Sequence, residues 1–215
     1  MRSLTRRAER TAKRSLALAP LSSEALAALR DEVAPRFRRR TGPDTSRIIE
    51  ALAIAAELVF RARGLRPRHV QLMGALALFD GYLVEMATGE GKSLTACLAG
   101  ALFGWSGRPC HVLTTNDYLA ARDAFEWHAY YAACGLTVAS VTGAKQRAER
   151  RAAYEAHVVY TTATELLADF LRDRIQLGGL SDADRRLVWR LARDPVAAGE
   201  GLVLRGIDTV LVDEA

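Results

Sequence analysis

A glycine-rich segment at residues 86–93 has the residue types and the spacing of a loop that binds phosphate; it reads Met-Ala-Thr-Gly-Glu-Gly-Lys-Ser. Glycines in such a loop allow backbone N–H groups to turn inward and approach a polyphosphate. Lys92 is long enough to reach the β- and γ-phosphates, and the hydroxyl of Ser93 can bind the Mg²⁺ that neutralises them. The segment therefore predicts a nucleotide site built from Thr88, Gly89, Glu90, Gly91, Lys92 and Ser93.

The residues on either side of this loop support the prediction more strongly than its letters do. Tyr82–Glu85 before it is strand-like, and Ser93–Phe103 after it is helix-like. The amino end of that helix would add partial positive charge where the phosphates bind. Met86 stands where the strict motif has its first glycine. Without the neighbouring strand and helix, the letters Gly-Glu-Gly-Lys-Ser would fit an exposed turn equally well.

Two carboxylates follow an apolar strand at the end of the sequence, where Val210–Val212 leads into Asp213 and Glu214. In nucleotide-driven motors an aspartate at this place holds Mg²⁺ through water, and a glutamate polarises the attacking water. Acidic residues at strand ends are common, so the pair alone is weak evidence. The glycine-rich loop about 120 residues upstream strengthens the interpretation. We expect Asp213 and Glu214 to be the catalytic residues, and Ser93 and Asp213 to hold the metal.

The elements that must position these residues alternate along the chain from Gln71 onward. The predicted strands are Leu83–Glu85, His111–Thr114, Thr137–Val141, Val158–Thr161 and Thr209–Val212. The predicted helices between them are Lys92–Phe103, Asp117–Cys134, Gln146–Ala156 and Ala163–Ile175. This alternation predicts an α/β fold with a parallel sheet, helices on both faces and a ligand at the carboxyl ends of the strands. Residues 176–206 break the pattern and are expected to be an insertion with a helix at Asp182–Arg193.

The amino-terminal segment differs from the rest of the chain in charge. Residues 1–40 contain 11 Lys and Arg against four Asp and Glu, and the remaining residues are slightly acidic. A helix at Arg2–Leu16 would have a thin apolar side, so we expect it to lie on the surface or to be disordered. Such a basic segment binds the phosphates of nucleic acid or anionic lipid, unless it is a solvated tail without a partner. We divide the chain into a basic helical arm, 1–45, and a nucleotide-binding domain, 46–215.

Composition and cysteine content fit a globular protein of a reducing compartment. Half of the residues are hydrophobic, and no apolar run approaches the ~20 residues that a membrane span requires. The basic start leads into an apolar stretch that is too short for a signal peptide. The three cysteines lack metal-ligand spacing and are expected to be buried free thiols.

Several further motifs occur in order along the chain. With the two already described, they are Val70-Gln71-Leu72, Glu85-Met86 with the loop at 88–93, Asn116-Asp117-Tyr118-Leu119-Ala120 with Arg122-Asp123, Asp169-Phe170-Leu171-Arg172-Asp173 and Leu211-Val212-Asp213-Glu214. With this series the chain resembles the amino-terminal motor domain of the SecA preprotein translocase ATPases over residues 46–174 and 207–215. The string at 116–123 is far more specific than a nucleotide motif, and it separates this family from RNA and DNA helicases of the same fold.

The resemblance implies a RecA-like motor domain that binds ATP and Mg²⁺ and couples ATP hydrolysis to protein export across the cytoplasmic membrane. It implies that Gln71 reads adenine, for which an amide is suited because it can donate and accept at once; the residue type alone favours an ordinary exposed glutamine. It also implies a cytoplasmic protein, peripheral at the inner membrane. Its basic segment would bind anionic lipid and a SecY-type channel.

The chain departs from the family pattern at several positions. Arg68 stands where the family often has an aromatic residue near the adenine, and Ser93 replaces a threonine. The sequence contains neither the second motor domain, whose arginines complete the γ-phosphate site, nor the domain that clamps the preprotein. We therefore expect a divergent member, either a fragment or a truncated product, that hydrolyses ATP poorly by itself, whereas the full-length protein would be an ATPase.

Two other hypotheses remain open at this stage. An RNA or DNA helicase module would share the fold and both nucleotide motifs. The basic charge lies in the amino-terminal arm rather than at the strand ends, which argues against nucleic acid as a partner. A truncated paralogue would bind a membrane, a channel or the intact translocase without hydrolysing ATP.

Overall fold

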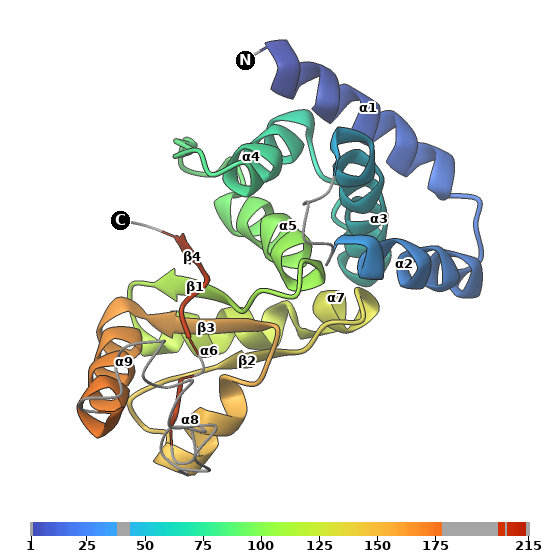
Figure 1. Ribbon diagram of the computed structural model, residues 1–215. Helices are drawn as coiled ribbons and strands as arrows, with labels where there is room; N and C mark the ends of the chain where they lie inside the picture. Colours follow the sequence, from blue (N-terminus) through green and yellow to red (C-terminus); the bar gives the residue numbers. More distant parts are fainter. Residues whose placement is uncertain (1, 38–43, 178–201, 205, 214–215) are drawn as a thin grey trace.

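The computed structural model describes residues 2–37, 44–177, 202–204 and 206–213 (Figure 1). A helical part precedes the sheet; its described helices are α1 (Arg2–Leu18), α2 (Ser23–Phe37), α3 (Thr45–Arg63), α4 (His69–Phe79) and α5 (Lys92–Trp105). Strands and helices then alternate as β1 (Cys110–Thr114), α6 (Asp117–Glu126), α7 (His128–Ala133), β2 (Val138–Ser140), α8 (Arg147–Ala153), β3 (Val158–Thr162), α9 (Ala163–Leu177) and β4 (Thr209–Val212).

The strands of the described residues form one parallel sheet in the order β2-β3-β1-β4. Cys110 at the start of β1 lies opposite Val158 of β3 on one side and opposite Thr209 of β4 on the other. Strand β3 is buried along most of its length, because a parallel strand covered by helices on both faces must bury both sets of its side chains. The predicted α/β fold with a parallel sheet is confirmed.

Helices cover both faces of this sheet, with α5 above it and α8 below it in Figure 1. Alternate residues of β3 enter different cores, since successive side chains of a strand point to opposite faces. Val158 and Tyr160 belong to the larger core, which continues into α1, α3, α4 and α5, whereas Val159 packs with Tyr154 and Leu166. The helix that follows the glycine-rich loop is thus fixed against the sheet.

The amino-terminal helix α1 lies on the surface, one of the two expected alternatives, and it is ordered, with one side closely packed although its apolar side looks thin in the sequence. Ala8, Thr11, Ser15 and Leu18 are buried in the packing of α1 against α3 and α4. In the sequence these small residues look like a weak apolar stripe, but their size allows neighbouring helices to approach closely. The Thr11 hydroxyl is satisfied because it donates to the Arg7 carbonyl at 2.9 Å.

The strand predicted at Leu83–Glu85 does not join the sheet. Residues 82–87 are extended but form no strand pair among the described residues. Val84 and Met86 instead pack against α4 at Gly74, where an added Cβ would lie 3.7 Å from Val84 Cγ1 and 3.5 Å from Met86 Sδ. Because alternate residues of an extended chain point to opposite sides, Leu83 is left fully exposed. The helix predicted after the loop does form, as α5.

The single helix predicted at Asp117–Cys134 is two helices, α6 and α7, which meet at Trp127. This residue has φ −91° and ψ 0°, outside the helical values. Its indole is buried, with the Arg63 guanidinium 5.2 Å from the ring centre and Tyr130 in a T-shaped contact. The change of direction at Trp127 accompanies the burial of this large side chain.

The structure also bears on the cysteines, on membrane spans and on the predicted insertion. All three cysteines are buried and free, as expected. None of the helices in the described part of the chain combines the length and the hydropathy that a membrane span requires. The helix predicted at Asp182–Arg193 lies outside the described residues, and so does most of the insertion. The domain boundary at residue 45 remains a prediction.

His111 of β1 makes the stability of the fold depend on pH. The ring is buried beside Tyr154, and its Nδ1 has no hydrogen-bond partner among the described residues. Burial lowers the pKa of His111, although a hydrogen bond with the Thr209 backbone and the charge of Asp208 act in the opposite direction. In the unfolded chain the ring returns to a pKa of about 6.5, so the unfolded state binds the proton first as the pH falls.

We therefore expect the free energy of unfolding to decrease as the pH is lowered from about 7.5 to about 5, and the His111→Gln variant to lack this component. Urea denaturation at a series of pH values measures it. A matched control replaces His128, which is exposed at the start of α7, and should keep the wild-type slope. Equal slopes for wild type and His111→Gln would contradict the prediction.

Candidate nucleotide-binding site

The predicted phosphate loop connects the extended segment 82–87 with helix α5. Its turn is closed by a hydrogen bond from the Glu90 N–H to the Ala87 carbonyl at 3.2 Å. Gly89 and Gly91 have φ values of 82° and 83°, in the left-handed region that glycine adopts at low cost. Thr88 and Gly89 are exposed at the tip. The two glycines are therefore required by the shape of the loop, as the sequence predicted.

Helix α5 begins immediately after the loop, with Gly91 as its N-cap. No side chain of the described residues caps this helix, and its first backbone bond runs from the Thr95 N–H to the Gly91 carbonyl at 3.1 Å. The first amides of a helix have no partner within it, so those of Lys92, Ser93 and Leu94 are left for another acceptor. Lys92 and Ser93 are half-buried here. An uncapped helix start that carries a lysine and a hydroxyl fits a polyphosphate with Mg²⁺.

Gln71 lies in the first turn of α4 and is buried, so the interpretation of an ordinary exposed glutamine is wrong. Its Oε1 accepts from the Arg68 N–H at 2.8 Å, and its Nε2 donates to the Glu90 carbonyl at 2.8 Å. The Arg68 guanidinium donates to the same carbonyl at 3.1 Å. The start of α4 therefore holds the phosphate loop, while the contact of Gln71 with adenine remains a prediction.

Asp213 follows directly after β4, and its N–H donates to the Leu113 carbonyl at 2.9 Å. Helix α5 packs against β1, β3 and β4, which joins the helix of Lys92 and Ser93 to the strand that delivers Asp213. The end of β4 and the loop before α5 lie on the same side of the molecule (Figure 1). Glu214 lies outside the described residues. The roles predicted for Asp213 and Glu214 remain predictions.

The donor set around the loop fits Mg²⁺ better than a metal held by protein alone. Among the described residues no group of three or more His, Cys, Asp or Glu side chains comes together as a metal site. Mg²⁺ at nucleotide sites is held by one or two protein oxygens together with phosphates and water. Ser93 and Asp213 could supply those oxygens.

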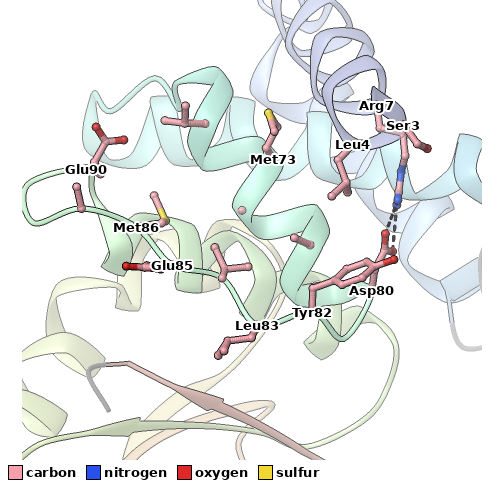
Figure 2. Close-up of a pocket in the computed structure, with 15 residues that line it drawn as sticks. Ser3, Leu4, Arg7, Met73, Asp80, Tyr82, Leu83, Glu85, Met86 and Glu90 are labelled. Atoms are coloured by element: carbon pink, nitrogen blue, oxygen red, sulfur yellow. Dashed lines mark hydrogen bonds and ion pairs between the residues drawn. The ribbon is translucent and has the colours of Figure 1, made fainter. Parts of the chain in front are cut away.

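A groove of about 600 Å³ borders the loop (Figure 2). It runs between the segment 82–87, helix α4 and the start of α1, and Arg7 of α1 pairs with Asp80 at one end. Glu90 is the one predicted site residue among its described lining residues. Its apolar lining includes Leu4, Val70, Met73, Ala77, Leu83, Val84 and Met86.

The motif residues at 116–123 have structural roles. Asn116 is the N-cap of α6, where its side chain accepts from the Leu119 N–H at 2.9 Å. Asp117 accepts from the Gly143 N–H at 2.7 Å and so holds the loop after β2. Arg122 donates to the buried carboxylate of Asp123. An asparagine before a helical pattern signals a cap in a sequence, whereas the bond to Gly143 depends on the fold.

Asp169 and Asp173 are further anchors, to which the sequence motif assigned no role. They lie one turn apart on α9, and both are buried. Asp169 accepts from Arg150 and from the Tyr154 hydroxyl, and Asp173 accepts from the N–H groups of Val203 and Leu204. They connect α9 to α8 and to the segment before β4.

The family model for the SecA DEAD-like domain matches residues 1–215, the whole chain. The chain belongs to the SecA family. Its α/β fold with a parallel sheet is that of a RecA-like DEAD-like domain. The match also covers residues 1–45 and 175–206, which the comparison of motifs left out.

Named relatives agree with this assignment of the SecA domain. "Protein translocase subunit SecA 2" of Chlorobium chlorochromatii is 46% identical over 205 residues, 95% of this chain and 30% of the relative. The protein of the same name in Magnetococcus marinus is 44% identical over 215 residues, 100% of this chain and 33% of the relative. "Protein translocase subunit SecA" of Mycobacterium avium is 40% identical over 218 residues, 96% and 26% of the two chains. The chain thus spans a third or less of the length of these relatives.

Proposed function

We propose that this SecA domain binds ATP with Mg²⁺ at the loop formed by residues 88–93. The observation that carries the proposal is the turn at Gly89 and Gly91, which leads directly into the uncapped start of α5. The backbone amides there would donate to the phosphates, and Lys92 would neutralise the β- and γ-phosphates.

The remaining site residues complete the proposal. Ser93 would bind Mg²⁺, and Asp213 would hold the same ion through water. Glu214 would orient and polarise the water that attacks the γ-phosphate. Gln71 would read adenine with the second N–H of its Nε2 and the second lone pair of its Oε1, because its bonds to the Glu90 carbonyl and the Arg68 N–H use one of each. When bound, Mg²⁺ would supply charge neutralisation of the phosphates.

In the whole protein we propose that hydrolysis drives polypeptide export across the cytoplasmic membrane. The relatives are named as translocase subunits, which supports this proposal. The protein would work on the cytoplasmic side, peripheral to the membrane. Its basic amino-terminal segment would bind anionic lipid and a SecY-type channel, since Arg6, Arg10 and Lys13 are exposed along α1. Preproteins would be bound by parts of the protein outside this domain.

The test measures ATP hydrolysis by the full-length protein. We expect vesicles that contain anionic lipid, together with an unfolded preprotein, to stimulate hydrolysis several-fold, as electrostatic attraction of the basic segment predicts. RNA and single-stranded DNA should have no effect, and the Lys92→Ala variant supplies the background rate.

Two outcomes would contradict the proposal. Stimulation by nucleic acid and not by vesicles would favour a helicase-type module, although the match to the SecA family gives that alternative no support. Complete absence of hydrolysis, with vesicle binding retained, would instead indicate a paralogue without catalytic activity.

A further inference from the structure

One backbone carbonyl of the phosphate loop is held by two side chains from the start of α4. The Glu90 carbonyl accepts from Gln71 Nε2 at 2.8 Å and from the Arg68 guanidinium at 3.1 Å. Gln71 is itself fixed, because its Oε1 accepts from the Arg68 N–H at 2.8 Å. Gln71 is buried and Arg68 is exposed, so Arg68 lies on the solvent side of this contact.

These two hydrogen bonds set the direction of an amide in the loop. The Glu90 carbonyl and the Gly91 N–H belong to one planar trans peptide and point in opposite directions. With the carbonyl held toward α4, the Gly91 N–H points away from α4. No hydrogen bond of this N–H occurs among the described residues. A bound phosphate could accept from it.

The end of the Gln71 side chain lies against the Cα atom of Gly91. A Cβ at Gly91 would lie 2.3 Å from Gln71 Nε2, and Gly91 has φ 83°. The Gln71 amide thus contacts the peptide between Glu90 and Gly91 from the side of α4, whereas the positive φ favours glycine independently of that contact.

We propose that Arg68 is a positioning residue of the phosphate loop. Together with Gln71 it keeps the Glu90 carbonyl turned toward α4 and thereby presents the Gly91 N–H to a phosphate. Arg68 acts through the loop backbone and does not contact the nucleotide. The inference rests on the proposed binding of ATP at this loop, and its test separates the two.

The test measures Kd by calorimetry for MgATP and for Mg-tripolyphosphate, with the full chain and its Arg68→Ala variant. Tripolyphosphate has no base, so a residue that acts through the loop must affect both ligands alike. Arg68→Ala is expected to raise both Kd values about five- to tenfold, the effect of one lost charge-assisted hydrogen bond from an exposed side chain. The charge-matched control Arg10→Ala, exposed on α1, should leave both unchanged.

Two further arms separate positioning from other roles. Arg68→Lys keeps a donor and the charge, so it should recover most of the affinity for both ligands. At about 0.5 M NaCl the attraction of a distant charge is screened, whereas a hydrogen bond within the protein persists. The ratio of the variant's Kd to the wild-type Kd should therefore survive the added salt.

Each contrary result has a definite meaning. A loss of affinity for ATP but not for tripolyphosphate would overturn the proposal, because Arg68 would then contact the base or ribose. An effect that disappears in high salt, or no effect at all, would overturn it as well. If Lys92→Ala abolishes binding while Arg68→Ala does not weaken it, the inference fails alone. If the wild-type chain binds neither ligand, the proposed function fails and the inference fails with it.

Discussion

The Asp169→Ala variant is expected to lose about 3–5 kcal/mol in the free energy of unfolding. Asp169 is 1% exposed, and its carboxylate accepts from Arg150 Nε at 2.9 Å, Arg150 Nη2 at 2.6 Å and the Tyr154 hydroxyl at 2.9 Å. Arg150 is buried as well. Removing Asp169 takes away the buried carboxylate that accepts from both Nε and Nη2 of Arg150 and leaves the guanidinium with Glu165 as its carboxylate partner, in a place that excludes water. Urea denaturation of both proteins measures the difference.

The local charges explain why the effect should be large. Burial by itself would lower the pKa of Arg150, but hydrogen bonds to Asp169 and Glu165 outweigh it and raise the pKa above its ordinary value. Burial, together with the charge of Asp169, also raises the pKa of Tyr154. Without Asp169, the Arg150 guanidinium keeps its bonds to Glu165 and to the Thr142 carbonyl, whereas the Tyr154 hydroxyl loses its acceptor.

The same carboxylate provides its own control. Arg172 also donates to Asp169, at 3.0 Å, but its side chain is 60% exposed. Pairs of that kind contribute about 0–1 kcal/mol, so Arg172→Ala should change stability little. Equal losses for Asp169→Ala and Arg172→Ala would show that the buried pair with Arg150 is not the source of the effect.

The parallel sheet could be predicted because its signal is local and repeated. Strands β1 and β3 are short runs of apolar and β-branched residues, and helices were predicted before β1, where α5 lies, and after β3, where α9 lies. In a parallel sheet such runs have few alternatives, since they must be buried on both faces. The strand order depends on contacts between distant residues and could not be derived from alternation alone.

The errors concern segments whose structure is decided by their neighbours. Residues 83–85 have the pattern of a strand, but Val84 and Met86 pack against α4 at Gly74, which has no side chain. Helix α1 has a weak apolar stripe, yet its small residues fit closely against α3 and α4. The long helical pattern is divided at Trp127, whose indole is buried. In each case a tertiary contact determines the conformation, against the local preference of the sequence for a strand, a loose helix or a single long helix.

For the candidate site, the glycines of the loop and the start of α5 could be predicted, because turn chemistry and a helix start are local features. The tether from Arg68 and Gln71 to the Glu90 carbonyl could not, since it joins residues about 20 positions apart through side chains. The anchoring roles of Asp169 and Asp173 also required the structure, which brings α8 and the segment 202–204 to α9.

The Lys92→Ala variant is expected to bind ATP on the order of 10²-fold more weakly than the wild-type chain. Lys92 is the first residue of α5 and is half-buried, so its ammonium group would reach the β- and γ-phosphates of an ATP bound at the helix start. Removing one partner of a charged contact that is partly shielded from water weakens binding by about 2–5 kcal/mol or more in comparable cases. A loss of affinity on the order of 10²-fold lies within this range. Alanine is a good helix former, so α5 should persist.

The matched control for this substitution is Lys13→Ala. Lys13 is exposed on α1, and its removal changes the net charge by the same amount. Equal affinities of Lys13→Ala and wild type would show that the effect of Lys92→Ala does not come from overall charge.

Calorimetric titration of the chain with ATP in the presence of Mg²⁺ tests the central claim most directly. We predict saturable binding of one ATP per chain, competed by tripolyphosphate, retained in Lys13→Ala and weakened on the order of 10²-fold in Lys92→Ala. An unchanged ATP affinity in Lys92→Ala would contradict the account, because the loop at 88–93 would then not be where the phosphates bind.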